Sequence, residues 1–434
     1  MDLPDRVIGE AYRFEAMETV EALTDIGSRM AGSEGEQAAM ATIADALRDA
    51  GARNVGVDQF QFPGWERGDC ELSLPDGRYE HPHQVLALPG GPSGAVTAPL
   101  VDVGYGTRAE FEAADVTGKL ALVSSDTPED HDRWLHRREK YDFAVEAGAA
   151  GFLFRNHVPG NLPPTGDVGR RDGPGPVPGV GVSRELGERL TRHCARGEQE
   201  ATLRVDCRNE RMTSGNVSGR LGPDTDELVL VTAHHDAHDI AEGARDNGAG
   251  CALVVELARM LAAIEDDLET GVQFVTFGAE EVGLRGSRLF VERAALNRVR
   301  AVVNCDALGD SRDLAVHTNG FEGLPEPFEA GADDVGVPVR IREGIAPHSD
   351  HWPFVRQGVP GVMAASDGGD DRGWGHTHGD TFDKLDRRDL RELAVPLAAA
   401  ILRIATGEPP ATHVDPAVIE RRAEREGHVL DDES

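Results

Sequence analysis

The chain has 434 residues, which is long enough for two or three domains and a large buried core. Its formal net charge is -33 at pH 7, and lysine occurs only at Lys119, Lys140 and Lys384. This charge argues against nucleic-acid binding, and it favours a halophilic protein, whose carboxylates repel one another less in concentrated salt, over an ordinary acidic cytosolic enzyme.

Cysteine usage and hydropathy narrow the class of protein further. The five cysteines are odd in number and include no Cys-x-x-Cys pair, so neither a disulfide framework nor a thiolate zinc site is expected. Residues 1–6 lack the basic and apolar regions of a signal peptide, and no apolar run approaches membrane-spanning length. We therefore expect a cytoplasmic protein that contacts no membrane.

The first part of the chain predicts helices over residues 7–49. Ser33 starts the pattern Ser-Glu-Gly-Glu, which is typical of a helix N-terminus, and the helix over 36–49 should end near Gly51. A strand is expected at 54–62. Residues 66–209 then hold short apolar runs separated by many prolines and glycines, with a long loop region at 160–182. We interpret 66–209 as a β-rich insertion.

Strands and helices alternate from residue 227 onward. Strands are predicted at 227–233, 271–279, 300–306, 313–317, 337–342 and 360–365. Helices are predicted at 247–264, 284–294, 325–335, 350–357 and 387–406. This alternation is typical of a three-layer α/β fold with a mixed, largely parallel sheet between helices. The main domain would comprise 1–65 and 210–408, and 409–434 would be a charged, loosely packed tail.

Imidazoles and carboxylates gather where the predicted strand 227–233 ends. Residues 232–239 are Thr-Ala-His-His-Asp-Ala-His-Asp. We interpret His234 as a metal ligand and Asp236, two positions on, as the carboxylate that holds its ring. His235 and His238 are rival ligands, which rank lower because neither has a carboxylate at the same offset.

Carboxylates also lie beside later predicted elements. Asp246 precedes Asn-Gly-Ala-Gly and a predicted helix, and its two oxygens would suit a bridge between two cations. Glu280 and Glu281 end the next strand, and adjacent residues of an extended chain point in opposite directions. One glutamate can therefore bind metal while the other takes a proton from water.

Two further candidate ligands follow. Asp306 ends the apolar run 301–305, and His376 lies in the loop before the final helix, with Asp380 as a candidate support for its ring and His378 as a rival ligand. Histidines and carboxylates at successive strand ends are the donors of a pair of zinc-like ions with a catalytic base beside them.

The combination resembles the co-catalytic zinc peptidases that include aminopeptidase S, aminopeptidase Y and glutamate carboxypeptidase II. The matching motifs occur in the family's order and cover about residues 1–65 and 210–408. They are His234-x-Asp236, Asp246-Asn-Gly-Ala-Gly250, Ala279-Glu-Glu-x-Gly-Leu-x-Gly-Ser287, Asn304-x-Asp306, Ser349-Asp-His351 and His376-Thr-x-x-Asp-Thr381. Residues 115–155 resemble, more loosely, a protease-associated (PA) domain.

This resemblance implies roles for the candidate residues. One Zn²⁺ would be held by His234, Asp246 and Asp306, and a second by Asp246, Glu281 and His376. Another divalent ion such as Co²⁺ or Mn²⁺ is the alternative to zinc. Glu280 would be the general base, and Asp236 would be the second catalytic residue. The peptide bond between Asp246 and Asn247 would be cis.

Gly375 departs from the family pattern. Several members place a tyrosine just before the last histidine ligand, where its hydroxyl can stabilise an oxyanion. Here either another donor replaces that hydroxyl or zinc alone holds the oxyanion. Ser349 and His351 lie near the site by family pattern, and His351 is a candidate donor. The alternative, that Ser349-Asp-His351 only caps the helix after it, has equal weight.

The function that the sequence predicts is that of a zinc-dependent exopeptidase, interpreted as an aminopeptidase acting on peptides. A carboxypeptidase or dipeptidase of the same family is the first alternative. A glutaminyl cyclase, which uses one zinc and no hydrolysis, is the second. A receptor-like binding protein that has lost its metals is the third.

Overall fold

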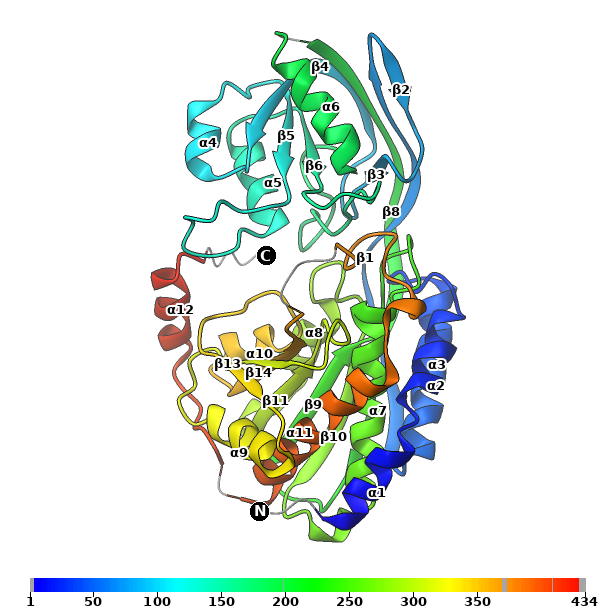
Figure 1. Ribbon diagram of the computed structural model, residues 1–434, viewed down its shortest axis with the longest axis vertical. Helices are drawn as coiled ribbons and strands as arrows, with labels where there is room; N and C mark the ends of the chain where they lie inside the picture. Colours follow the sequence, from blue (N-terminus) through cyan, green and yellow to red (C-terminus); the bar gives the residue numbers. More distant parts are fainter. Residues whose placement is uncertain (1–3, 198, 369–372, 408, 429–434) are drawn as a thin grey trace.

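The computed structural model describes residues 4–197, 199–368, 373–407 and 409–428. It contains two bodies stacked along the longest axis of the molecule (Figure 1). The lower body holds the N-terminal helices and the C-terminal half of the chain, and the upper body holds most of the segment coloured cyan to green. Strands β1 (Arg53–Leu74) and β8 (Gln199–Leu221) run along one side of both.

The lower body is built on a mixed sheet in the order β13-β12-β14-β11-β9-β10-β8. Its centre, β14-β11-β9-β10, is parallel, whereas β8 runs antiparallel to β10 and β12 runs antiparallel to β14. The strands that follow β8 are β9 (Leu228–His234), β10 (Gly271–Phe277), β11 (Val299–Cys305), β12 (Leu314–His317), β13 (Val339–Arg342) and β14 (Gly361–Ser366). The predicted sheet is confirmed, and parallel central strands bring their carboxyl ends to one edge.

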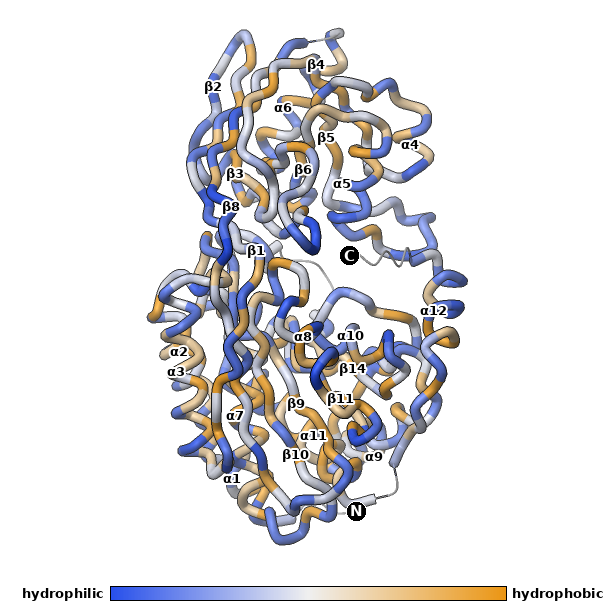
Figure 2. The backbone as a smooth tube through the Cα atoms, turned by 180° about the vertical axis from the view of Figure 1, so that it is seen from behind, coloured by the Kyte–Doolittle hydropathy of each residue, from blue (hydrophilic) through white to orange (hydrophobic). Residues whose placement is uncertain are grey.

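Helices cover both faces of this sheet because the central strands are apolar on both sides. In β9, Val229 and Val231 belong to the larger core, whereas Leu230 points the other way and belongs to a smaller cluster with Phe354. Figure 2 shows these hydrophobic strands inside the lower body. The helices beside the larger core are α1 (Asp5–Arg13), α2 (Ala16–Thr24), α3 (Glu34–Asp49), α7 (Ala249–Ala262), α9 (Pro325–Val335) and α11 (Arg387–Thr406). The smaller cluster packs against α8 (Arg285–Arg293) and α10 (Trp352–Arg356).

The upper body continues the same sheet, because β4 pairs antiparallel with residues 199–205 of β8. Strands β4, β5, β6 and β7 are parallel neighbours, and β3 closes the far edge antiparallel to β7. Its elements are β2 (Gly77–Tyr79), β3 (Val85–Ala87), β4 (Gly94–Gly104), α4 (Arg108–Ala113), β5 (Leu120–Ser124), α5 (Arg137–Glu146), β6 (Gly151–Arg155), β7 (Gly179–Val182) and α6 (Arg184–Cys194). The predicted loop at 160–182 therefore ends in a strand.

A ribbon of β1 and β8 connects the two bodies. The strands pair antiparallel from Arg53 opposite Arg220 to Ser73 opposite Thr202. The predicted strand at 54–62 is too short, because Pro63 indicated an end, but a strand at the edge of a sheet tolerates proline. The predicted domain limits at 65/66 and 209/210 fall in the middle of this ribbon, where Trp65 lies opposite Asn209, and these limits stay a prediction.

The C-terminal segment differs from the expected loose tail. Residues Pro416–Arg425 form the helix α12, capped by the Asp415 carboxylate, which accepts a hydrogen bond from Ala417 N at 2.9 Å. Ile419 and Ala423, one turn apart among charged residues, are buried in the core. The end of the predicted tail, 429–434, lies outside the described residues. Among the helices of the described part, none has the length and hydropathy needed to cross a bilayer.

Candidate metal centre

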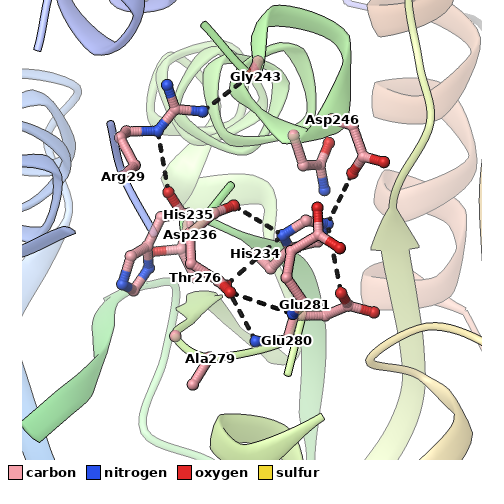
Figure 3. Close-up of polar contacts among 12 residues, drawn as sticks. Arg29, His234, His235, Asp236, Gly243, Asp246, Thr276, Ala279, Glu280 and Glu281 are labelled. Carbon is pink, nitrogen blue, oxygen red and sulfur yellow. Dashed lines mark hydrogen bonds and ion pairs between the residues drawn. The ribbon is translucent and has the colours of Figure 1, made fainter. Parts of the chain in front are cut away.

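The candidate site forms at the carboxyl ends of the parallel strands (Figure 3). His234 is the last residue of β9, Asp306 follows β11, and Glu280 and Glu281 lie in the turn after β10. Asp246 belongs to a short π-helical turn, Ala244–Gly248, directly before α7, and its bond to Asn247 is cis, as the resemblance implies. Loops that are far apart in the sequence therefore meet at one edge of the sheet.

One group of potential ligands surrounds His234. Its Nε2 lies 3.1 Å from Asp246 Oδ1, 3.5 Å from Asp306 Oδ1 and 4.0 Å from Glu280 Oε2. Its Nδ1 faces the backbone oxygen of Asp236 at 3.1 Å. An imidazole that donates from Nδ1 to a carbonyl presents its Nε2 lone pair, which is the form in which histidine binds a metal ion.

A second group surrounds His376. Its Nε2 lies 3.2 Å from Asp246 Oδ2 and 3.4 Å from Glu281 Oε2. The Nε2 of His238 lies 3.0 Å from the same Glu281 oxygen, and the rings of His238 and His376 stand nearly perpendicular at a centroid distance of 4.7 Å. Asp246 thus turns one oxygen to each group, which is the arrangement of a carboxylate that bridges two cations.

The charges in the centre are unbalanced. Burial raises the pKa of Glu281 to about 8, and Asp246 adds to the effect. Burial, followed by Asp350 and Glu281, also raises the pKa of Glu280 well above its ordinary value. Burial disfavours ionisation of Asp246 as well, but the His234 and His376 rings hold its pKa well below the usual range. So many carboxylates in one buried cluster fit a site for cations, and the mixture of imidazoles and carboxylates suits zinc.

Asp236 does not hold the His234 ring in the way that the sequence predicted. Its Oδ1 lies 3.7 Å from His234 Nδ1, and only its backbone oxygen is within hydrogen-bonding distance of that nitrogen. The carboxylate instead accepts hydrogen bonds from Glu280 N at 3.0 Å and Glu281 N at 3.1 Å (Figure 3). Asp236 therefore fixes the turn that carries both glutamates. The sequence did not indicate this role, because β9 ends at His234 and the alternation of side chains along a strand no longer applies at Asp236.

Asp380 also has a different partner from the expected one. Its two oxygens accept hydrogen bonds from Arg245 N at 2.7 Å and Asp246 N at 3.0 Å rather than from the ring of His376. It therefore orients the backbone of Asp246. The Nδ1 of His376 faces the guanidinium of Arg137, whose Nη1 lies 3.4 Å away.

Ser349 and His351, both candidates from the sequence, have different surroundings. Ser349 Oγ accepts a hydrogen bond from Asn304 Nδ2 at 2.7 Å and donates to Asp306 Oδ2, so it orients a candidate ligand. His351 directly precedes α10 and is fully buried, and its ring nitrogens have no hydrogen-bond partner among the described residues. It is in neither ligand group, so its proposed role as an oxyanion donor gains no support from its position.

The rival histidines are also separated by the structure. His235 points to the other side of β9, where its Nδ1 lies 3.1 Å from Thr276 Oγ1 (Figure 3). His378 lies between two backbone oxygens, with Nδ1 2.8 Å from Ile240 O and Nε2 3.1 Å from Pro82 O. Only His238 of these rivals faces a candidate ligand, which is Glu281.

Arg29 is a residue of the site that sequence reasoning missed. Its guanidinium is fully buried and donates to the backbone oxygens of His235 at 3.1 Å, Leu23 at 3.1 Å, Glu242 at 2.6 Å and Gly243 at 2.8 Å. Arg29 therefore holds the loop between β9 and α7 closed. No local pattern marks it, because its partners in that loop are about two hundred positions away.

Glu36 and Arg137 were missed for the same reason. Glu36 Oε1 accepts hydrogen bonds from Ala279 N at 3.2 Å and Ser214 Oγ at 2.6 Å, which ties the start of α3 to the turn before Glu280. Arg137, at the start of α5, is buried and reaches from the upper body to His376. The upper body therefore contributes a charged side chain to the centre.

Comparisons with known proteins agree with this organisation. The sequence pattern described as "Peptidase family M28" matches residues 216–401, a stretch that contains every candidate ligand. The pattern described as "PA domain" matches residues 96–190, in the upper body.

Relatives match over most of their length. The chain is 29% identical over 411 residues to "Aminopeptidase YwaD" of Bacillus subtilis (strain 168), covering 89% of this chain and 83% of the relative. It is 23% identical over 412 residues to "Carboxypeptidase Q" of Mus musculus, covering 91% and 86%. Among solved structures, BSAP, described as a zinc aminopeptidase from Bacillus subtilis, matches with a TM-score of 0.72 and 28% identity, covering 95% of this chain and 98% of that one.

Proposed function

This chain belongs to peptidase family M28 and carries an inserted PA domain, and we propose that it is a zinc-dependent aminopeptidase that releases N-terminal residues from peptides. Support comes from the relatives named as aminopeptidases, which match the chain over most of its length. One observation carries the proposal: the two oxygens of Asp246 face two separate groups of potential ligands.

Two zinc ions are the proposed cofactor. One would be held by His234, Asp246 and Asp306, and the other by Asp246, Glu281 and His376. The crowded buried carboxylates support this assignment, because cations would offset their repulsion. Bound zinc would supply Lewis acidity to the peptide carbonyl and would make water acidic enough to lose a proton near neutral pH.

Glu280 is the proposed general base. Its backbone N–H is fixed on Asp236 Oδ1 at 3.0 Å, and its carboxylate lies beside His234 without being one of the proposed ligands. It would accept the proton of the attacking water and pass it to the amine that leaves. Asp236 positions Glu280 and Glu281 together, which supports its place among the catalytic residues through the turn that it holds.

A panel of short peptides tests the direction of cleavage. We expect release of the first residue from free peptides and from peptides with an amidated C-terminus, and no reaction with N-acetylated peptides. Release of the last residue from free and N-acetylated peptides, with no reaction of amidated peptides, would identify a carboxypeptidase. The match to Carboxypeptidase Q makes this the first alternative. Release of no amino acid from any peptide by the zinc-loaded protein would contradict both.

The strong negative charge of the chain bears on the salt concentration at which the enzyme works and on its partners. We infer that it is halophilic, acts in the cytoplasm and binds no nucleic acid. The formal net charge of -33 supports the first and last of these, because carboxylates repel phosphates and repel one another less when salt screens them. A gel-shift assay with duplex DNA and RNA should give no complex at low salt, where such binding is strongest.

A further inference from the structure

His238 is a buried histidine that the ligand set taken from the family leaves without a role. Its side chain is 5% exposed, and neither ring nitrogen has a hydrogen-bond partner among the described residues. Proteins rarely leave the ring nitrogens of a buried imidazole without hydrogen-bond partners unless the group has a function. The nearest acid to its Nε2 is Glu281 Oε2, at 3.0 Å.

We propose that His238 is a further ligand of the ion held by Glu281 and His376. The ligand atoms of His238, Glu281 and His376 lie within 4.8 Å of one another, so one ion can reach all three. Asp246 Oδ2 borders the same space, 3.2 Å from His376 Nε2. This inference rests on the proposed function, because it assumes that the centre binds metal.

The loop around His238 is held on both sides, so the backbone that carries the ring is positioned before any ion arrives. Ala237 N donates to Arg29 O at 3.1 Å. The carboxylate of Asp239 pairs with Arg67 of the ribbon, with Oδ1 2.6 Å from Nη2 and Oδ2 2.9 Å from Nε. A histidine on a loop that is fixed in this way needs no rearrangement of the backbone to bind a metal ion.

His238 would make the two ion sites unequal. The ion at Glu281 would have four protein ligands, as structural zinc sites do, whereas the ion at His234 would have three and an open position. Glu280, the proposed general base, lies beside the group around His234, with its Oε2 4.0 Å from His234 Nε2. We therefore expect the ion at Glu281 to bind more tightly, and we expect water to bind at the ion held by His234.

Zinc retention in the full-length protein tests the proposal. Zinc-loaded wild type, His238→Gln and His378→Gln are equilibrated with a series of free-zinc buffers, and bound zinc per chain is measured by mass spectrometry. His378 is the matched control, because its ring binds Ile240 O of the same loop but faces no carboxylate of the centre. We expect two ions in wild type and in the control.

His238→Gln should need a free-zinc concentration more than about 10²-fold higher to keep one of its two ions. Loss of a residue that only supports a ligand costs about 10–100-fold in affinity, so loss of a ligand should cost more. A retention curve equal to that of wild type would overturn the proposal, and so would a loss of turnover with both ions retained. If wild type itself holds fewer than two ions or cleaves no peptide, the proposed function fails, and the inference fails with it.

A second measurement needs no variant. Cadmium-113 is substituted for zinc in wild-type protein labelled with nitrogen-15 in histidine, and couplings between cadmium and ring nitrogens are recorded by NMR. Three coupled imidazoles are expected, from His234, His376 and His238. Two coupled imidazoles would overturn the proposal even if His238→Gln failed to fold.

Discussion

Asp246 is the residue on which both proposed ion sites depend, because each of its oxygens faces a different group. We expect Asp246→Asn to lose tight binding of both ions, since an amide presents only one oxygen and no charge. Zinc content after dialysis measures the loss. Asp58→Asn, an exposed residue that pairs with Arg293, is the control and should keep two ions. Two tightly bound ions in Asp246→Asn would show that the bridge is misassigned.

Glu280 is predicted to act on protons and not to bind metal. Glu280→Gln keeps the shape of the side chain and removes its basicity, so kcat should fall by about 10²–10⁴-fold while two ions remain bound. Steady-state kinetics and zinc content of the same sample check the two halves of this expectation. The same change at Glu292, an exposed partner of Arg171, should leave both unchanged. Near-normal kcat in Glu280→Gln would refute the assignment.

At the residue scale, the sequence identified the residues that meet in the centre but not all of their partners. His234 ends a strand, Asp306 directly follows one and Glu281 lies in the turn after another. Strand ends can be located from apolar runs alone. Asp236 and His238 lie in a loop, where no fixed period tells which way a side chain points. For that reason the sequence indicated neither the hydrogen bonds that the Asp236 carboxylate accepts from Glu280 N and Glu281 N nor the position of His238 opposite Glu281.

At the element scale, the loop between β9 and α7 depends on Arg29. We expect Arg29→Ala to lower the free energy of unfolding by about 2–4 kcal/mol, because it leaves several buried carbonyl oxygens without a donor. Urea unfolding of zinc-loaded and zinc-free protein measures the change. Arg48→Ala, at an exposed residue that pairs with its helical neighbour Asp45, is the matched control and should change little. An equally small change in Arg29→Ala would contradict the assigned role.

Element boundaries were predictable where local chemistry sets them. Helix α11 begins at Arg387 because Asp386 accepts a hydrogen bond from Arg388 N at 2.7 Å, and it ends before Gly407; both signals are visible in the sequence. The ribbon was not predictable in full, because the length of β1 depends on pairing with β8, about 150 residues later. Long-range pairing of this kind leaves no signal in a short window.

The acidic surface belongs to the scale of the whole molecule. Carboxylates repel one another over roughly 30 Å at 0.01 M salt and about 3 Å at 1 M, so compactness should increase with salt. We expect the thermal midpoint and the peptidase activity to rise together as potassium chloride goes from dilute to molar. Scanning calorimetry and peptide hydrolysis over the same series test this. A midpoint that is flat or falls with salt would rule out the halophilic proposal and leave the peptidase proposal intact.

The ribbon also has a consequence for the order in which the chain folds. In the described structure β1 pairs only with β2 and β8, and most of its partners lie between residues 202 and 220. During synthesis, β1 must therefore wait without its main partner until nearly half of the chain has emerged. Closing so long a loop is slow unless the intervening residues have already collapsed. We therefore expect the upper body to fold before the lower sheet is complete, so that the inserted segment brings β8 to β1.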